Sequence, residues 1–302
     1  MIFFFFSLQE RPLENLINVN LSCCEFITEL PKLWAPNLES LELAGCEKLV
    51  KLTELEAPNL NYLDLSYCEN LVEIDECFGS LEKLTTWVLE GCRKLQILPS
   101  QLRLKSLYNF SLSGCSSLEK LPNFHPEMEC LKILKLVGSG IREVPSSIEH
   151  LTKLEELYLF ECKNLGDLPD SIYKLQQLQE LATPTAKLRP TCDSFYGSSG
   201  YGFVNMWRLN FRGYEGIIEL DLLMKPDYFP ALEYLNLSDT NIVTIPESIS
   251  RFPRLEKLSI RNCKLLREIQ GLPQSISTVY VNNSMLLNTS PSGLFNQVSL
   301  SL

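Results

Sequence analysis

The chain has 302 residues, of which 45% are hydrophobic and 21% charged, and its formal net charge at pH 7 is −10. Non-specific nucleic-acid binding requires a basic surface, so this acidic balance argues against nucleic acid as a partner. No stretch approaches the run of about 18 apolar residues that a membrane-spanning helix needs, so no membrane partner is expected either.

The chain begins with an apolar segment that includes four consecutive phenylalanines within residues 1–8. No Lys or Arg precedes this segment, and it ends at Gln9, which makes it shorter than most signal-peptide cores. Its aromatic side chains can instead cover the first coil of the fold or face a neighbouring domain. We therefore expect residues 1–12 to form an N-terminal cap or a truncated first repeat.

A repeated apolar pattern follows and is clearest in residues 38–52. Its frame is L-x-x-L-x-L-x-x-C-x-x-L-x-x-L, with Cys46 in the cysteine position. The frame starts at residues 16, 38, 60, 84, 107, 131 and 154, at intervals of 22 to 24, and it returns at 232 and 255. The copies at 131 and 232 are one residue shorter and carry Ser139 and Thr240 instead of the cysteine. This period is typical of leucine-rich repeats.

The spacing within each copy predicts the fold. Leu41 and Leu43 face one side of a short strand, while the side chains of Ser40, Glu42 and Ala44 face the other. A strand this short is stable only when it pairs with the strands of neighbouring copies in a parallel sheet. We therefore predict an α/β repeat fold, a leucine-rich-repeat solenoid shaped as a curved horseshoe, with a concave parallel sheet and with loops and short helices on the convex side.

The repeat frame is regular in some parts of the chain and irregular in others, and these parts define the expected segments. The irregular part contains a degenerate repeat that can be traced through Val204, Trp207 and Leu209. An insertion of this kind is either a binding loop or ordinary repeat decay. The expected segments are the cap at 1–12, repeats at 13–182, an irregular insertion with degenerate repeats at 183–231, repeats at 232–288 and a C-terminal tail at 289–302.

Four copies end in a proline that is followed three residues later by Leu or Ile, namely Pro99, Pro145, Pro169 and Pro246. Proline fixes φ and lacks an N–H, which suits the start of a short helix or 3₁₀ turn. We expect the Ser, Asp or Glu that follows each proline to accept hydrogen bonds from the free amides of that turn.

Seven of the eleven cysteines occupy one position of the frame, just after the strand. A small side chain with weak hydrogen-bonding capacity suits a turn where the backbones of neighbouring coils pass close together. Translated neighbours have parallel Cβ vectors, which disfavours both disulfides and the tetrahedral convergence of a metal site. We therefore predict reduced thiols and no metal site at Cys24, Cys46, Cys68, Cys92, Cys115, Cys162 and Cys263.

No pattern indicates catalysis or a cofactor. His125 and His150 are the only histidines, and neither adjoins a nucleophile motif. A phosphate-binding loop is missing, and residues 197–202 differ in spacing from a dinucleotide-binding loop. We expect no enzyme activity, no catalytic residue and no cofactor.

The outward positions of the strands should form the recognition surface. In the first coils they are small or acidic, whereas in the middle coils they are apolar and aromatic. Exposed apolar patches with aromatic anchors mark partner sites. We predict that Tyr158 and Phe160 anchor a protein ligand, unless the insertion at 183–231 folds over this patch and buries it. The candidate residues on the concave face are Tyr62, Asp64, Ile133, Lys135, Val137, Glu156, Tyr158, Phe160, Tyr234, Arg261 and Tyr280.

Several phrases resemble a known family. Residues 13–22 (LENLINVNLS), 35–46 (APNLESLELAGC), 112–122 (LSGCSSLEKLP) and 271–276 (GLPQSI) are similar to the C-terminal repeats of plant intracellular nucleotide-binding leucine-rich-repeat immune receptors, above all the class with a TIR domain. The resemblance implies a module that senses a pathogen effector or a guarded host protein. It also implies restraint of the nucleotide-binding module of the same or a partner receptor, in the cytoplasm or nucleus. This sequence contains neither a TIR nor a nucleotide-binding module, so their chemistry does not carry over.

Two other functions stay open. An extracellular receptor ectodomain or inhibitor would use the N-x-[ST] sequons, at Asn20, Asn109, Asn236, Asn282 and Asn288, although such motifs are weak signals. A cytosolic signalling scaffold resembling small Ras-pathway repeat proteins shares the L-P-x-x-[IL] phrase but not the row of cysteines. Binding of a signalling GTPase would favour the scaffold.

Overall fold

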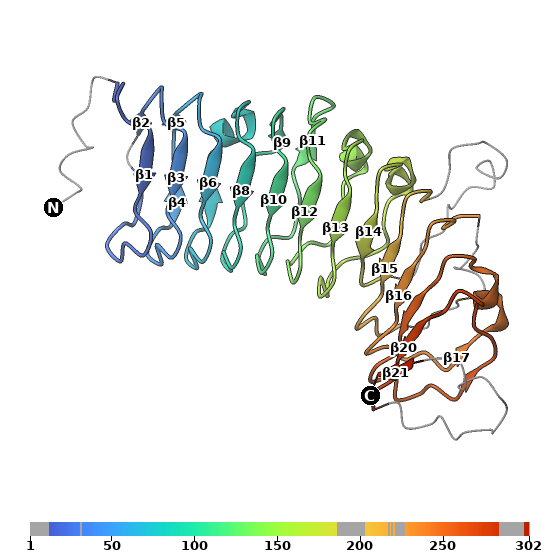
Figure 1. Ribbon diagram of the computed structural model, residues 1–302. Coiled ribbons are helices and arrows are strands. Elements are labelled where there is room, and N and C mark those ends of the chain that lie inside the picture. The colour runs from blue at the N-terminus through green and yellow to red at the C-terminus, as the bar shows by residue number, and fades with distance from the viewer. Residues whose placement is uncertain are drawn as a thin grey trace. The chain divides into compact units, whose positions relative to one another are not determined.

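The computed structural model describes residues 12–30, 32–185, 203–216, 218, 220, 227–283 and 299–301. The chain divides into two compact units, the first comprising Met1–Leu154 with Cys162–Leu165 and the second comprising Glu155–Glu161 with Gly166–Leu302. Each unit is a stack of coils (Figure 1). The apolar segment at 1–8 and most of the expected insertion lie outside the described residues.

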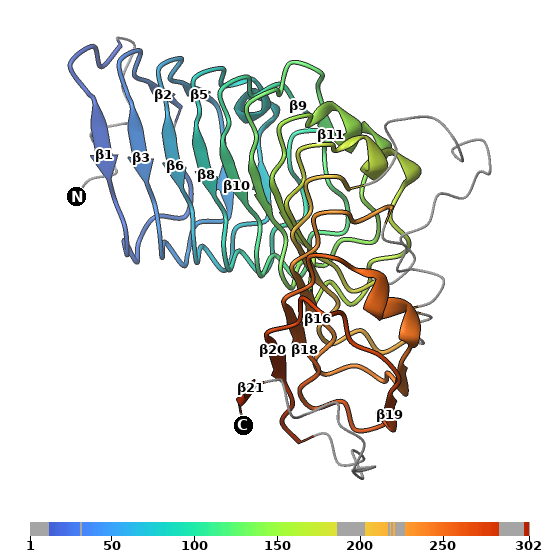
Figure 2. The ribbon, with the colours of Figure 1, turned by 45° about the vertical axis from the view of Figure 1, so that its right-hand side comes forward.

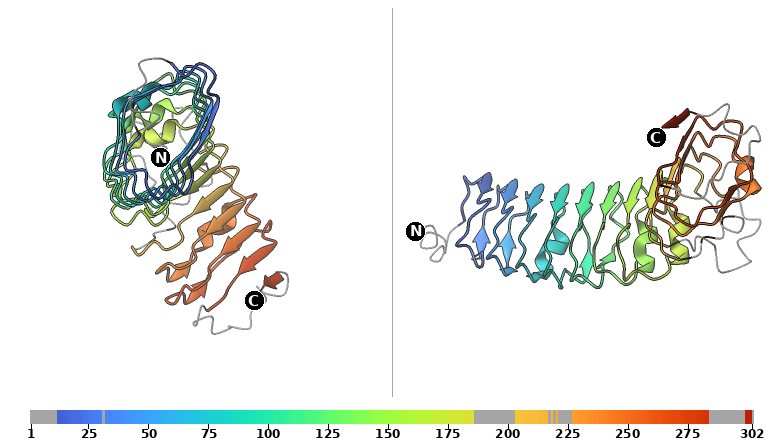
Figure 3. Two further views of the ribbon diagram at one scale, coloured as in Figure 1. Left: turned by 90° about the vertical axis from the view of Figure 1, so that its left-hand side faces the viewer. Right: turned by 90° about the horizontal axis from the view of Figure 1, so that it is seen from below.

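The first unit contributes six parallel strands, one from each coil, to a 13-stranded sheet (Figures 1 and 2). Neighbouring strands are in register, with Leu41 opposite Leu63 for example. Leu41 is buried and its neighbours Ser40 and Glu42 are half-buried, which confirms the predicted alternation. Seen nearly along the stack, the coils of this unit superpose (Figure 3). The strands are β1 (Asn18–Asn20), β3 (Ser40–Glu42), β6 (Tyr62–Asp64), β8 (Thr86–Val88), β10 (Asn109–Ser111) and β12 (Ile133–Lys135).

The second unit repeats this arrangement, again with neighbouring strands parallel and in register. One of its strands falls within the expected insertion, where Met206, Leu209 and Phe211 are buried in the three leucine positions and Val204 is exposed. The strands are β13 (Glu156–Tyr158), β14 (Glu180–Ala182), β15 (Arg208–Asn210), β16 (Tyr234–Asn236), β18 (Lys257–Ser259), β20 (Thr278–Tyr280) and β21 (Ser299–Ser301). One parallel strand per copy of the repeat frame confirms the leucine-rich-repeat solenoid.

The return segments of the coils form pairs of two-residue parallel strands. These strands are too short to show a period of two, and the sequence did not predict them. The pairs are β2 (Leu33–Trp34) with β5 (Leu55–Glu56), β4 (Lys51–Leu52) with β7 (Glu73–Ile74), β9 (Gln101–Leu102) with β11 (Asn123–Phe124), and β17 (Thr244–Ile245) with β19 (Glu268–Ile269).

Four of the described return segments also contain a 3₁₀ helix. Pro145, Pro169 and Pro246 each precede one of them, as predicted. The prediction was wrong after Pro99, where Gln101–Leu102 forms strand β9 and pairs with β11 instead. The proline itself is the N-cap residue of each of these three helices and makes no side-chain cap hydrogen bond, so the capping role expected of the residues that follow it stays a prediction. The helices are η1 (Glu76–Ser80), η2 (Ser146–His150), η3 (Asp170–Lys174) and η5 (Glu247–Arg251).

The row of cysteines ties successive coils together. Each buried thiol donates a hydrogen bond to the carbonyl of the residue that follows the strand of the preceding coil, so a buried backbone acceptor is satisfied. Ser139 and Thr240 are buried in the equivalent position of the two shorter copies. The Sγ···O distances are 3.1 Å for Cys46–Leu21, 3.1 Å for Cys68–Leu43, 3.1 Å for Cys92–Leu65, 3.2 Å for Cys115–Leu89, 2.9 Å for Cys162–Leu136 and 3.1 Å for Cys263–Leu237.

The residue just before the cysteine position is left-handed in nearly every coil. Its φ is +71° at Gly45 and +74° at Gly91, and it stays positive where a non-glycine residue stands there. The left-handed residue turns the chain out of the strand, which explains the recurrent Gly-Cys pair. The non-glycine residues are Cys23, Tyr67, Glu161, Asp239, Asn262 and Asn283. Within the described ranges, no helix has the length and apolar character needed to span a bilayer.

Candidate ligand-binding face of the second unit

Five of the predicted site residues lie in the first unit, on the solvent side of its sheet. Tyr62 and Asp64 belong to β6, and the Tyr62 hydroxyl lies 3.4 Å from Asp64 Oδ2. Burial raises the pKa of Tyr62, and the nearby carboxylates add to the shift. Ile133 and Lys135 belong to β12 and Val137 follows it, and all three are half-buried.

Tyr158 lies on β13 of the second unit between two carboxylates. Its hydroxyl is 3.0 Å from Glu156 Oε2 and 2.9 Å from Glu180 Oε2. Burial raises the pKa of Tyr158 above its usual value, as do the hydrogen bond and charge of Glu180 and those of Glu156. The phenol therefore stays protonated at neutral pH and donates its hydrogen to a carboxylate. Phe160 is half-buried just after this strand.

The six residues expected to form one apolar patch divide between the two units. Ile133, Lys135 and Val137 belong to the first unit, and the residues from 156 to 160 belong to the second. The continuous patch therefore stays a prediction. The alternative, in which the insertion covers the patch, also stays open, because residues 186–202 lie outside the described ranges.

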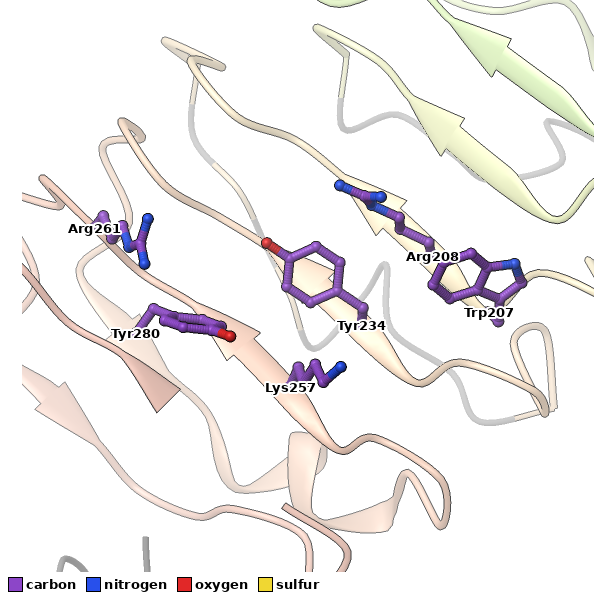
Figure 4. Close-up of a pocket in the computed structure, with 6 residues that line it drawn as sticks. All are labelled: Trp207, Arg208, Tyr234, Lys257, Arg261 and Tyr280. Atoms are coloured by element: carbon purple, nitrogen blue, oxygen red, sulfur yellow. The ribbon is translucent and has the colours of Figure 1, made fainter. Parts of the chain in front are cut away.

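The structure brings three other predicted residues together, Tyr234, Arg261 and Tyr280. They line a surface hollow of about 440 Å³ with Trp207, Arg208 and Lys257. The lining residues come from β15, β16, β18, β20 and their flanks, so successive coils each supply a side chain (Figure 4). In this view Tyr234 lies between the Trp207–Arg208 pair and the Lys257–Tyr280 pair. The hollow is thus a continuous feature of the second unit's sheet.

Aromatic rings hold the arginines of this hollow. The guanidinium carbon of Arg208 lies 5.1 Å from the centroid of the Tyr234 ring, and that of Arg261 lies 4.6 Å from the centroid of Tyr280. Both distances are within the range of cation–π attraction. Arg208 Nη1 also lies 3.6 Å from Glu180 Oε2, so one carboxylate joins the Tyr158 site to the hollow.

Three residues that line the hollow were not predicted from the sequence, namely Trp207, Arg208 and Lys257. Lys257 occupies the first outward position of a regular copy, immediately before the buried Leu258, so the frame itself could have identified it. Arg208 falls in an outward position whether the degenerate copy is aligned on Val204 or on Met206, so the frame could have identified it too. Trp207 was missed because alignment on Val204 places it in a buried leucine position, whereas Met206 fills the first leucine position in the structure and Trp207 is half-buried.

Within the described residues, the cysteines and histidines have structural rather than reactive roles. They contain no cluster of His, Cys, Asp or Glu suited to a metal ion, and none of the ten cysteines within the described ranges forms a disulfide. Burial raises the pKa of Cys68 to about 12, so that thiol is not a nucleophile at neutral pH. The Nδ1 atom of His150 lies 2.8 Å from the carbonyl oxygen of Phe124.

Comparison with known proteins agrees with this repeat architecture. The family described as "Disease resistance protein RPS4B-like, leucine-rich repeats" matches residues 103–288, and a general leucine-rich-repeat family matches residues 59–81. An LRR protein of Leptospira interrogans has a solved structure that is 19% identical, with a TM-score of 0.37, and the match covers 89% of this chain and 90% of that one.

Two plant proteins are similar over most of this chain. TMV resistance protein N of Nicotiana glutinosa is 28% identical over an alignment of 265 positions, which covers 71% of this chain and 23% of that protein. SUPPRESSOR OF npr1-1, CONSTITUTIVE 1 of Arabidopsis thaliana is 30% identical over 219 residues, which are 72% of this chain and 14% of that protein. The chain therefore spans less than a quarter of either relative. The resemblance to the repeats of TIR-class plant disease resistance proteins is confirmed, and the chain belongs to the RPS4B-like disease resistance family of leucine-rich repeats.

Proposed function

We propose that this chain is a non-enzymatic protein-recognition module of plant defence. Its protein ligand is a pathogen effector or a guarded host protein, and it restrains the nucleotide-binding module of the same or a partner receptor in the cytoplasm or nucleus. Membership of a disease resistance family supports this proposal. The relatives are much longer than this chain, so the restraint rests on analogy with them.

The hollow on β15–β20 is the observation that supports ligand binding most directly. Tyr, Trp and Arg are the residue types that dominate the binding energy of protein interfaces, and they do so when they cluster. Five of the six lining residues are of these types, and most are half-buried rather than packed into the core. Such a cluster contributes little to the solenoid core, whose interior is filled by leucine, so a role in recognition explains it better than a role in folding.

The sequons are less favourable to the extracellular alternative. Asn20, Asn109 and Asn236 lie within strands β1, β10 and β16 of the sheet. The Asn236 side chain is buried, and its Oδ1 accepts a hydrogen bond from Ser238 N at 3.0 Å. A glycan on Asn236 would have to fit a buried side chain and would disturb this contact.

Binding to an arrayed collection of effector proteins and their host targets tests the proposed function. We expect at least one ligand whose affinity falls about 30-fold in Tyr234→Ser, because an aromatic hot spot contributes about 2 kcal/mol or more. The matched control is Tyr108→Ser. Tyr108 is 46% exposed and carries Lys132 5.8 Å from its ring centroid, but it lies in the first unit. Ligands that bind both variants like the unaltered chain would contradict recognition through this face.

A further inference from the structure

We propose that the hollow on β15–β20 binds an acidic peptide segment of the protein ligand, with carboxylates at Lys257 and Arg261. The inference rests on the proposed function and deepens it by naming the chemistry that the site recognises. It follows from the charges, the pre-positioned arginines and the dimensions of the hollow.

Three cationic side chains line the hollow, Arg208, Lys257 and Arg261, whereas no carboxylate belongs to its lining. Glu180 lies 3.6 Å from Arg208, and it already accepts a hydrogen bond from the Tyr158 hydroxyl at 2.9 Å. No ion pair with Lys257 or Arg261 occurs in the part of the chain that the structure describes. In a chain with a net charge of −10, two cations that line one hollow without an acidic partner among the described residues form a local positive site that attracts carboxylates.

The Tyr280 ring positions the Arg261 guanidinium in the absence of a ligand. The Tyr280 ring lies over the guanidinium of Arg261, with 4.6 Å between the ring centroid and the guanidinium carbon. A ring covers a face of the guanidinium plane, whereas a carboxylate pairs with its N–H edge, so the two contacts are compatible. Side chains that are positioned before binding lose less conformational entropy on binding, which favours affinity.

The dimensions suit an extended peptide. Neighbouring strands lie about 4.8 Å apart, so the four strands from β15 to β20 present these side chains across about 15 Å. An extended chain covers that distance with about five residues. Side chains at every second position of such a segment point to the same side. Aspartate or glutamate at alternate positions would therefore face the hollow together.

Single-stranded nucleic acid is the competing ligand, because it also binds surfaces that combine aromatic and cationic side chains. It requires a positive groove that follows its backbone. Carboxylates flank this hollow instead, from Glu156 and Glu180 on β13 and β14 and from Asp239 after β16. These carboxylates repel a long polyanion but leave room for a short acidic segment.

Fluorescence anisotropy with the whole chain tests this inference. The probe is a short labelled peptide that alternates serine and aspartate, and the matched probe carries asparagine instead of aspartate. We expect the aspartate peptide to bind at low ionic strength and at least about tenfold more tightly than the asparagine peptide, which corresponds to about 1.4 kcal/mol. Added salt should weaken this binding, because the charges are solvent-accessible.

Charge reversal identifies the site. The double variant Lys257→Glu and Arg261→Glu should lose at least about tenfold in affinity for the aspartate peptide. The control, Arg254→Glu with Lys264→Glu, makes the same change in net charge at exposed positions of the same unit outside the hollow, and should stay within about twofold. Circular dichroism should show the same unfolding transition for both variants, since all four side chains are exposed.

Three results would overturn the inference: equal binding of the two peptides, equal losses in the two double variants, or tighter binding of an oligothymidine that the Lys257 and Arg261 changes abolish. If an arrayed protein ligand loses affinity in Tyr234→Ser while the aspartate peptide fails to bind, the proposed function stands and only the acidic chemistry is wrong. If the peptide binds as expected but no protein ligand responds to the sheet face, the proposed function fails.

Discussion

Replacing Trp87 with alanine is expected to lower the free energy of unfolding by about 3–5 kcal/mol. Trp87 is the middle residue of β8, a position that holds leucine in most coils, and its side chain is fully buried. It pairs in register with Leu63 on one side and Phe110 on the other. Its ring stacks on Phe110 with centroids 5.1 Å apart and an interplanar angle of 25°. Alanine would leave a cavity that the neighbouring coils cannot fill without losing their register.

Two further variants make this result specific. Trp34 is 44% exposed on β2, so Trp34→Ala should change the free energy of unfolding by less than about 1 kcal/mol. Trp87 Nε1 is buried and has no hydrogen-bond partner among the described residues. Trp87→Phe removes this unpaired donor while keeping an aromatic ring, so it should cost less than about 1.5 kcal/mol. Urea unfolding measures all three, and similar losses for the two alanine variants would contradict the packing argument.

Gly140→Ala is expected to cost about 2–3 kcal/mol, because its Cβ would overlap the backbone of the preceding coil. A Cβ at this position collides with the carbonyl oxygen of Ser116 and lies 2.9 Å from its carbonyl carbon. Gly140 N also donates to Cys115 O at 3.1 Å. The coils can separate only by breaking that hydrogen bond, so the clash cannot be relieved by rotation of a flexible side chain.

Gly213→Ala is the matched control for this effect. Its φ is +74° and a Cβ there meets nothing within 4 Å, so alanine adds backbone strain of about 1–2 kcal/mol without a collision. Urea unfolding should therefore rank Gly140→Ala as the more destabilising variant. The reverse order would show that the coils move apart easily and that the left-handed turn limits stability instead.

The sequence predicts the sheet of this protein well because two signals coincide in each copy. Leu41 and Leu43 specify the buried side of a strand, and Cys46 marks the turn where its thiol meets the preceding coil. Both signals depend on short-range spacing, which a sequence displays directly. The two-residue strands such as β4 and β9 have no such signal, because they form only when a neighbouring coil supplies the partner.

The candidate site was predicted only in part. The repeat frame predicts that Tyr234 and Tyr280 face outward. Whether they lie close to Arg208 depends on the number of coils between their strands, which must be known first. The degenerate copy around Met206 hid one of those coils, since methionine and phenylalanine replace two leucines there. The cation–π pairs depend on side-chain conformations that spacing does not determine.

Hydroxyl-radical footprinting of the chain with a protein ligand from the arrayed collection tests the central claim most directly, because it measures the solvent accessibility of individual aromatic side chains. If the ligand binds the hollow, oxidation of Trp207, Tyr234 and Tyr280 should fall several-fold. Oxidation of Tyr67 and Phe26, which are 60% and 76% exposed in the first unit, should not change. Unchanged oxidation of the three hollow residues, with protection elsewhere on the chain, would contradict recognition through this face.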